Sequence, residues 1–122
     1  MRAAPEMPAW RDFRLFVRLT RPHFLLGGVL LYGLGAAIAH YQGYSIDPGL
    51  YFLGQLLVTL LQLMTHYLNE YHDAAGDQQN QSRTLLSGGS GVIGPGGLPA
   101  KVALYSAVIS AGLAATIASA SL

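Results

Sequence analysis

Residues 65–83 read THYLNEYHDAAGDQQNQSR, and this stretch ends a long apolar run in a cluster of negative charge. Glu70, Asp73 and Asp77 place three carboxylates within eight positions, and Arg83 is the only lysine or arginine in the stretch. Like charges at such spacing destabilise a helix. The apolar run indicates the fold class, and the charges that end it indicate a candidate site.

The chain is poor in charged residues. Of its 122 residues 52% are hydrophobic and 11% are charged, against roughly 25% charged in a soluble domain. Three stretches free of Asp, Glu, Lys and Arg, residues 22–46, 48–69 and 102–122, each reach the roughly 20 residues that cross a bilayer. We therefore predict an all-α integral membrane bundle with three transmembrane helices. The absence of cysteine excludes disulfides and thiolate metal sites.

The basic residues predict how the chain lies in the membrane. The connection at residues 42–47 has no lysine or arginine, whereas five arginines precede the first span. Because cytoplasmic connections are enriched in these residues, the N-terminus is predicted to be cytoplasmic. Arg83 and Lys101 lie in the next connection, residues 70–101, which places the acidic cluster on the cytoplasmic side of a multi-pass protein of the cell (inner) membrane. The five arginines are Arg2, Arg11, Arg14, Arg18 and Arg21.

The N-terminal segment divides into two parts. Residues 1–9 have two prolines and no periodicity, which predicts disorder, and residues 10–21 have the pattern of an amphipathic helix at the headgroup layer. An early extension of the first membrane helix is the alternative. A signal peptide, with residues 37–39 as its cleavage pattern, is a competing interpretation that the two further spans disfavour. The apolar side of the amphipathic pattern is Trp10, Phe13, Phe16 and Val17, and its basic side is Arg11, Arg14 and Arg18.

Glycine and alanine mark the remaining segments. Small residues in the first and third spans favour close helix packing in lipid. The segment LLSGGSGVIGPGGLP, residues 85–99, is too rich in glycine and proline for a helix, and it lacks the pattern of a P-loop. The third span stops at Leu122 without a flanking anchor, from which we expect the chain to be the N-terminal part of a longer protein.

A stripe of polar side chains runs along the second span. At about 100° per residue, eight polar positions fall within one arc about 100° wide, while the opposite surface is mostly leucine, valine and methionine. Such a stripe is expected to face the bundle interior or a wet cavity. For its first three members we favour polar contacts between helices. The stripe consists of Gln55, Thr59, Gln62, His66, Asn69, Glu70, Asp73 and Asp77.

The end of this stripe has the chemistry of a magnesium site. Asn69, Asp73 and Asp77 are spaced four residues apart, so successive side chains lie about 6 Å apart on one helix face. A divalent cation removes the repulsion, and Mg²⁺ is typically held by one or two carboxylates together with phosphate oxygens and water. Gly76 favours fraying of the last turn. A solvated acidic helix end is the alternative.

Arg83 and the histidines complete the candidate residues. Arg83 follows Asp77 by six positions, and an arginine fork suits phosphate oxygens. His66 lies on the stripe and His72 on the far side, and both are interpreted first as hydrogen-bonding groups. His23 and His40 are interpreted as interfacial.

At these residues the sequence resembles the UbiA-type intramembrane prenyltransferase superfamily. The aspartate-rich motif of that family, Asn-Asp-x-x-Asp-x-x-x-Asp, aligns with Asn69, Glu70, Asp73 and Asp77, with glutamate in place of the first aspartate. The pair Arg21-Pro22 is similar to the start of the first helix in the family. The segment LNEYHDAAGDQQNQSRTLLSGGSGVI most resembles the dihydroxynaphthoate prenyltransferases of menaquinone synthesis.

The resemblance implies a bundle of about nine helices in which Mg²⁺ at two acidic motifs activates a polyprenyl diphosphate. The allylic cation left by loss of diphosphate would be captured by an aromatic acceptor, most simply 1,4-dihydroxy-2-naphthoate. Carried over by position, Asn69, Asp73 and Asp77 would be metal-site residues, with Asp73 and Asp77 catalytic, and Asn69 and Arg83 would contact the substrate. The second acidic motif is not within these 122 residues, so this chain alone is expected to be inactive.

Two alternatives to this hypothesis stay open at the sequence level. The acceptor could instead be homogentisate, 4-hydroxybenzoate or a haem-pathway compound. A small non-enzymatic membrane protein with an acidic helix end is the other. In each case the expected surroundings are membrane lipid, and nothing in the charge pattern points to nucleic acid.

Overall fold

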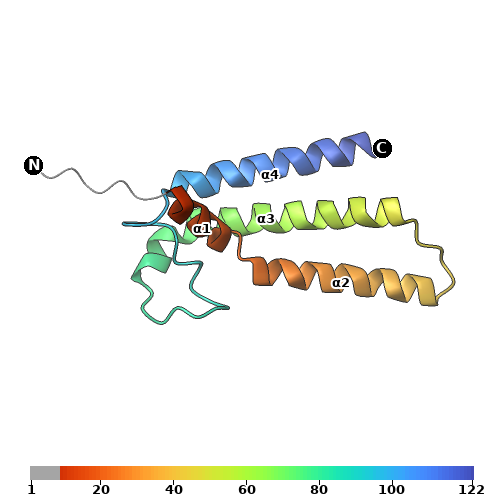
Figure 1. Cartoon of the computed structure of the whole chain (residues 1–122), viewed down its shortest axis with the longest axis horizontal. Coiled ribbons are helices and arrows are strands. Elements are labelled where there is room, and N and C mark those ends of the chain that lie inside the picture. The colour runs from red at the N-terminus through yellow and green to blue at the C-terminus, as the bar shows by residue number, and fades with distance from the viewer. Residues whose placement is uncertain (1–8) are drawn as a thin grey trace, which may run out of the picture.

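The structure is a computed structural model that describes residues 9–122, and that part of the chain has four helices (Figure 1). Three of them, α2, α3 and α4, are long and apolar enough to cross a membrane. This confirms the predicted all-α class and the three membrane helices. The helices are α1 (Ala9–Leu19), α2 (Pro22–Tyr41), α3 (Pro48–Gln79) and α4 (Ala100–Ala120).

The largest difference from the sequence-based boundaries concerns α3. This helix continues through Gly76 to Gln79, so the first third of the predicted 70–101 loop is helical, and the expected fraying at Gly76 is wrong. A glycine costs only about 1 kcal/mol in a helix interior, and packing of Tyr71 and Ala74 against the buried core offsets that cost. The carboxylates therefore stay in register on one helix face.

The other boundaries shift less. α2 ends at Tyr41 instead of residue 46, because residues 42–47 turn the chain toward α3. Asp47 caps the start of α3 by accepting a hydrogen bond from the Leu50 N–H at 2.8 Å, as expected of an N-cap aspartate. α4 begins directly after Pro99 and ends at Ala120. Ala9 is already helical, and the rest of the segment predicted to be disordered lies outside the described residues.

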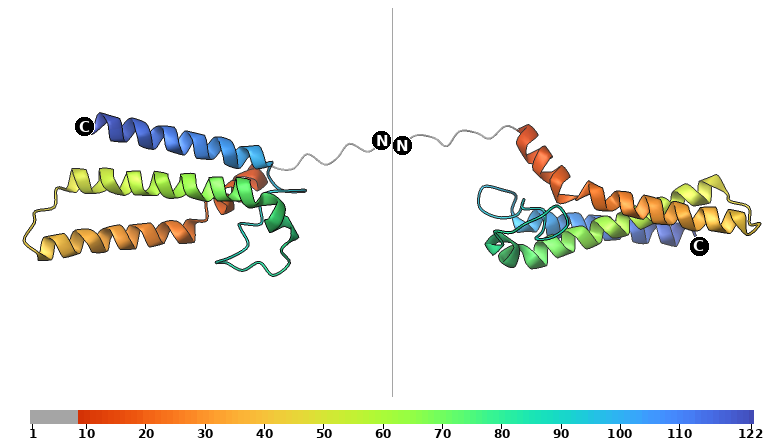
Figure 2. Two further views of the ribbon diagram at one scale, coloured as in Figure 1. Left: turned by 180° about the vertical axis from the view of Figure 1, so that it is seen from behind. Right: turned by 90° about the horizontal axis from the view of Figure 1, so that it is seen from below.

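The three long helices form one layer with α3 in the middle (Figures 1 and 2). α4 packs against α3 through four small buried residues at helical spacing, which allow close approach of the backbones. On the other side, Gly28 of α2 makes room for Gln62, and Gly54 of α3 makes room for the Tyr32 hydroxyl. The small buried face of α4 is Ala103, Ala107, Ser110 and Ala114.

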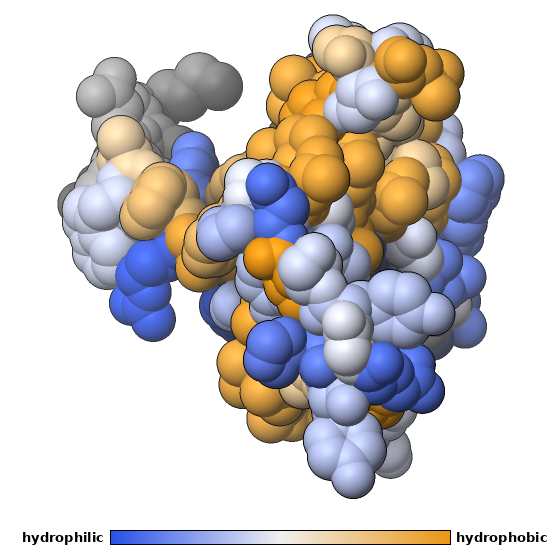
Figure 3. All heavy atoms as spheres, turned by 90° about the vertical axis from the view of Figure 1, so that its right-hand side faces the viewer, coloured by the Kyte–Doolittle hydropathy of each residue, from blue (hydrophilic) through white to orange (hydrophobic). Residues whose placement is uncertain are grey.

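The outer surface of the layer is hydrophobic along its sides. Leu30, Leu34 and Ile38 of α2 and Val108 and Ile109 of α4 are among the exposed apolar side chains. Figure 3 shows hydrophobic surface over the upper part of the molecule and hydrophilic surface gathered at the end that faces the viewer. Apolar sides with polar ends are the pattern of a helical membrane protein.

The glycine-rich segment folds back and supplies the core at the opposite end of the layer. Val92, Ile93 and Leu98 are buried against Leu19 of α1 and Tyr67 of α3. The tight return between them is held by the Leu98 N–H, which donates to the Val92 carbonyl at 2.8 Å. Gly97 is required here, since a β-carbon would collide with that same carbonyl.

α1 is a separate helix that leaves the plane of the layer (Figure 2). The chain breaks at Arg21, which has φ 51° and ψ 62° in the left-handed region, so a continuous first membrane helix is excluded. Leu19 is fully buried, whereas Trp10, Phe13 and Val17 on the other side of α1 are exposed. This arrangement fits the predicted interfacial helix.

The α3–α4 contact gives the first testable prediction. Ala107→Leu inserts bulk where the side chain is 1% exposed, and overpacking of this kind costs about 1–3 kcal/mol. We expect a clear fall in the thermal unfolding midpoint in detergent. Ala115→Leu, on the exposed face of the same helix, is the control and should leave the midpoint unchanged. Equal midpoints for the two variants would contradict the packing described.

Candidate functional site

The carboxylates at the end of α3 line a small polar hollow beneath the glycine-rich loop. Asn69, Glu70, Asp73 and Asp77 all contribute to it, and its volume is about 180 Å³. Since about 10–15 Å³ suffices for one water, an ion with several waters fits. We call this space the acidic hollow; its remaining lining is Arg21 from the α1–α2 junction and residues 86–89 from the loop.

Three of these four polar side chains have free oxygen atoms. Within residues 9–122, the side chains of Asn69, Asp73 and Asp77 accept no hydrogen bond, and neither aspartate has a cation within 4.0 Å. In the same part of the chain, no three His, Asp or Glu side chains lie close enough to hold a metal by themselves. The hollow therefore offers a partial set of oxygen ligands.

Glu70 behaves differently from its neighbours. It is 3% exposed, and both of its carboxylate oxygens accept hydrogen bonds from one residue of the loop. The Ser90 N–H donates to Oε1 at 2.7 Å, and the Ser90 hydroxyl donates to Oε2 at 2.8 Å. Sequence reasoning placed Glu70 in the acidic cluster but gave no sign that Ser90, twenty positions later, is its partner.

Arg83 joins the loop to the end of α3. Its Nε donates to the Gly88 carbonyl at 2.6 Å, and its Nη2 donates to the Asp77 carbonyl at 2.6 Å. The Asp77 carbonyl also accepts from the Asn80 N–H at 3.2 Å. A cation bonded to a carbonyl in the last helical turn is favourable, because it opposes the helix dipole. Arg83, the predicted phosphate contact, therefore also links the loop to the end of α3; we call this pair of bonds the Arg83 staple.

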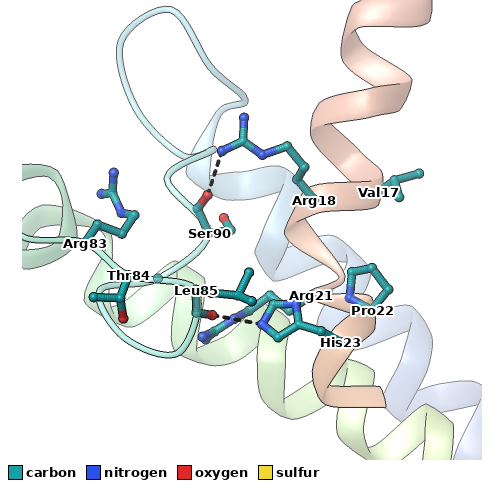
Figure 4. A pocket seen from close by; sticks show the side chains of 10 residues that line it. Val17, Arg18, Arg21, Pro22, His23, Arg83, Thr84, Leu85 and Ser90 are labelled. Atoms are coloured by element: carbon teal, nitrogen blue, oxygen red, sulfur yellow. Dashed lines mark hydrogen bonds between the residues drawn. The ribbon is translucent and has the colours of Figure 1, made fainter. Parts of the chain in front are cut away.

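A second hollow of about 450 Å³ lies beside the first and is basic (Figure 4). Arg18, Arg21 and Arg83 reach it from three different segments, together with His23. Arg18 donates to the Ser90 carbonyl at 3.2 Å, and His23 Nε2 bonds the Leu85 carbonyl at 2.9 Å, which makes this nitrogen the protonated one. We call this space the basic hollow.

The two hollows adjoin each other. Arg21 and Gly89 line both of them. Arg21 is held in its strained backbone conformation at the break between α1 and α2, and its guanidinium carbon lies 4.4 Å from the centre of the Phe24 ring. A non-glycine residue in the left-handed region costs about 1–2 kcal/mol, and such strain is often found at functional sites. From the sequence, Arg18 and Arg21 were named as arginines that orient the chain, Arg21 also as part of an Arg-Pro pair, and His23 as interfacial; none of the three was predicted at the site.

Of the three stripe residues expected to make polar contacts between helices, Gln55, Thr59 and Gln62, only Gln62 hydrogen-bonds to another helix. Gln62 donates to the Phe24 carbonyl of α2 at 3.3 Å, and His66 Nδ1 donates to the Thr20 carbonyl at 2.9 Å. Gln55 instead donates to Thr59 within α3, at 3.1 Å. The bonds of Gln62 and His66 fix the position along α3 at which the α1–α2 junction, and with it Arg21, packs.

Comparison with known proteins adds no relative. No family model, curated protein or solved structure matches the chain. What the structure shows is an all-helical chain with three helices long and apolar enough to cross a membrane. The resemblance to the UbiA-type prenyltransferases therefore remains a prediction from the motif Asn69, Glu70, Asp73 and Asp77.

The staple at Arg83 is testable by proteolysis. Arg83→Ala removes both bonds to carbonyls and should raise the rate of chymotryptic cleavage beside the exposed Leu85 and Leu86 by about fivefold, because opening of the loop becomes easier. Arg83→Lys keeps the charge without the fork and should fall between Arg83→Ala and the parent. Arg14→Ala is the control. A cleavage rate equal to that of the parent would refute the staple.

Proposed function

We propose that this end of the bundle binds the magnesium complex of a polyprenyl diphosphate and contributes to transfer of the prenyl group to an aromatic acceptor. The observation that carries the proposal is the contact between an acidic hollow and a basic hollow through Arg21. A diphosphate with its cation needs both kinds of lining side by side. A polyprenyl diphosphate dissolved in the membrane would have its diphosphate at the membrane surface, near the end of a membrane-spanning helix.

The acidic hollow fits Mg²⁺ in a particular way. Asp73 and Asp77 supply two carboxylates and Asn69 an amide oxygen, and none of these oxygens is taken by another group of the described chain. Mg²⁺ is usually held by one or two carboxylates, substrate phosphate and water instead of an all-protein cage. Bound there, it would supply Lewis-acid stabilisation of the leaving diphosphate.

The basic hollow supplies the groups for the phosphate oxygens. Arg21 lines both hollows, so its guanidinium can neutralise charge on a diphosphate bound where they meet. Arg18 and Arg83 are already bonded to backbone carbonyls, and each keeps further N–H groups for an anion. The bond from carbon to the diphosphate oxygen breaks, a bond to the aromatic ring forms, and the ring loses a proton.

The acceptor that the loop similarity favours is 1,4-dihydroxy-2-naphthoate, as in menaquinone synthesis, and other aromatic acceptors remain alternatives. We propose further that these residues form one half of a metal site that other carboxylates complete. A small membrane protein that binds cations at an acidic helix end is the competing hypothesis from a different class.

Metal binding separates these hypotheses in the chain itself. We expect Mn²⁺, used as a paramagnetic substitute for Mg²⁺, to bind the chain in phosphatidylcholine nanodiscs more tightly when inorganic diphosphate is present. Asp73→Asn should weaken that binding at least about tenfold, because it removes one of the two negative charges that would attract the cation. Arg21→Ala should weaken the diphosphate-dependent part only. Asp12→Asn, on the exposed side of α1, is the matched control.

Spectroscopic titration of bound Mn²⁺ gives the readout. Binding that does not respond to diphosphate would favour the incidental cation site of a small membrane protein. Binding that Asp73→Asn leaves unaltered would remove the metal hypothesis altogether.

The chemistry requires a separate assay, on a protein that holds a complete metal site. With a polyprenyl diphosphate and 1,4-dihydroxy-2-naphthoate, product formation should depend on Mg²⁺ and should fall by about a hundredfold or more in Asp73→Ala, because the leaving group then lacks its counter-charge. Product measured by chromatography decides the outcome. Equal activity of parent and variant would exclude Asp73 from the reaction.

A further inference from the structure

Glu70 stands in the acidic motif, but its carboxylate makes hydrogen bonds to the loop, unlike the carboxylates of Asp73 and Asp77. Its carboxylate is turned to Ser90, and at 3% exposure water has little access to replace those bonds. The carboxylates of Asp73 and Asp77, one and two turns further along the same helix, accept no hydrogen bond from the described chain. The cluster therefore contains two kinds of carboxylate.

The loop around Ser90 needs an anchor because its own backbone is permissive. Gly88, Gly89 and Gly91 all have positive φ, between 73° and 83°, a conformation that glycine adopts without steric cost and without strong preference. Successive backbone N–H groups in such conformations form a concave nest for an anion. Here the anion that the Ser90 N–H meets is the Glu70 carboxylate.

Ser90 is held from several directions at once. Its carbonyl accepts from Arg18 of α1, its hydroxyl accepts from the Val92 N–H at 3.3 Å, and Val92 itself is buried in the core. Gly89, immediately before it, passes so close to Asp77 that a β-carbon would collide with the Asp77 carboxylate. Fixing Ser90 thus fixes the segment that lines the acidic hollow from above.

We propose that Glu70 is a positioning residue of this site and not a ligand of the metal: its carboxylate anchors Ser90 and holds residues 87–91 as a roof over Asp73 and Asp77. The arm of glutamate suits this role, because its additional methylene carries the carboxylate away from the helix toward the loop. The assignment concerns loop geometry, and only its consequence for metal and diphosphate rests on the proposed function.

Glutamine separates the two roles. In Glu70→Gln the amide oxygen still accepts from the Ser90 N–H and the amide nitrogen donates to the Ser90 hydroxyl, so an anchor survives, whereas a metal ligand loses its charge. Glu70→Ala removes the anchor and leaves the half-buried Ser90 N–H without its partner. Asp73→Asn is the matched control, since it removes charge from the hollow without touching Ser90.

The first readout is hydrogen–deuterium exchange of the loop amides in nanodiscs without metal. We expect Glu70→Ala to accelerate exchange at residues 90–92 by about tenfold or more, Glu70→Gln to stay within about threefold of the parent, and Asp73→Asn to match the parent. Exchange in Glu70→Ala equal to that of the parent overturns the proposal. If Glu70→Ala does not fold, Ser90→Ala replaces it, with an expected acceleration of at least about threefold.

The second readout is Mn²⁺ binding in the presence of inorganic diphosphate. Glu70→Gln should bind within about threefold of the parent, while Asp73→Asn loses at least about tenfold. A loss in Glu70→Gln as large as in Asp73→Asn, with loop exchange unchanged, makes Glu70 a ligand and overturns the proposal. If the parent itself binds neither Mn²⁺ nor diphosphate, the proposed function fails, and loop exchange still decides whether Glu70 is the anchor.

Discussion

The structure depends on α3 staying helical after its apolar run ends. Three carboxylates within two turns oppose that, and so does Gly76. The opposition is overcome at two points. Tyr67 and Ala74 pack into a core built with the returning loop, and Arg83 bonds a carbonyl of the last turn. Because the helix continues, Asn69, Asp73 and Asp77 share one face and one hollow.

The same loop explains why charges of opposite sign lie beside each other without pairing directly. Residues 80–99 cross over the end of α3 and are tied to α1 by Arg18, to α2 by His23 and to α3 by Glu70. Backbone carbonyls, instead of the aspartates, receive the arginine donors. The site thus keeps free carboxylate oxygens on one side and arginine N–H groups on the other, which suits a ligand that is itself a cation–anion complex.

Sequence reasoning was most accurate where a regular period carried the information. The apolar runs predicted the three long helices, and the 100° rotation per residue placed Asn69, Asp73 and Asp77 on one face, as the acidic hollow confirms. It was less accurate where contacts distant in sequence decide. The second span was ended at residue 69 because charge begins at Glu70, and Gly76 was expected to fray the last turn. The core from residues 92–98, which supports the helix as far as Gln79, leaves no local signal.

The site shows the same division. Composition and spacing alone determined a membrane bundle with a polar stripe and an acidic end, because hydrophobicity and helical period are properties of neighbouring residues. Only the tertiary structure decided that Glu70 faces Ser90, that Arg18 and Arg21 line the adjoining hollow, and that Arg83 staples the loop. Such contacts join residues far apart in the sequence, as in the bond from Arg18 to the Ser90 carbonyl, 72 positions later. A glycine-rich chain can return along many paths, and the burial of Val92, Ile93 and Leu98 selects one of them.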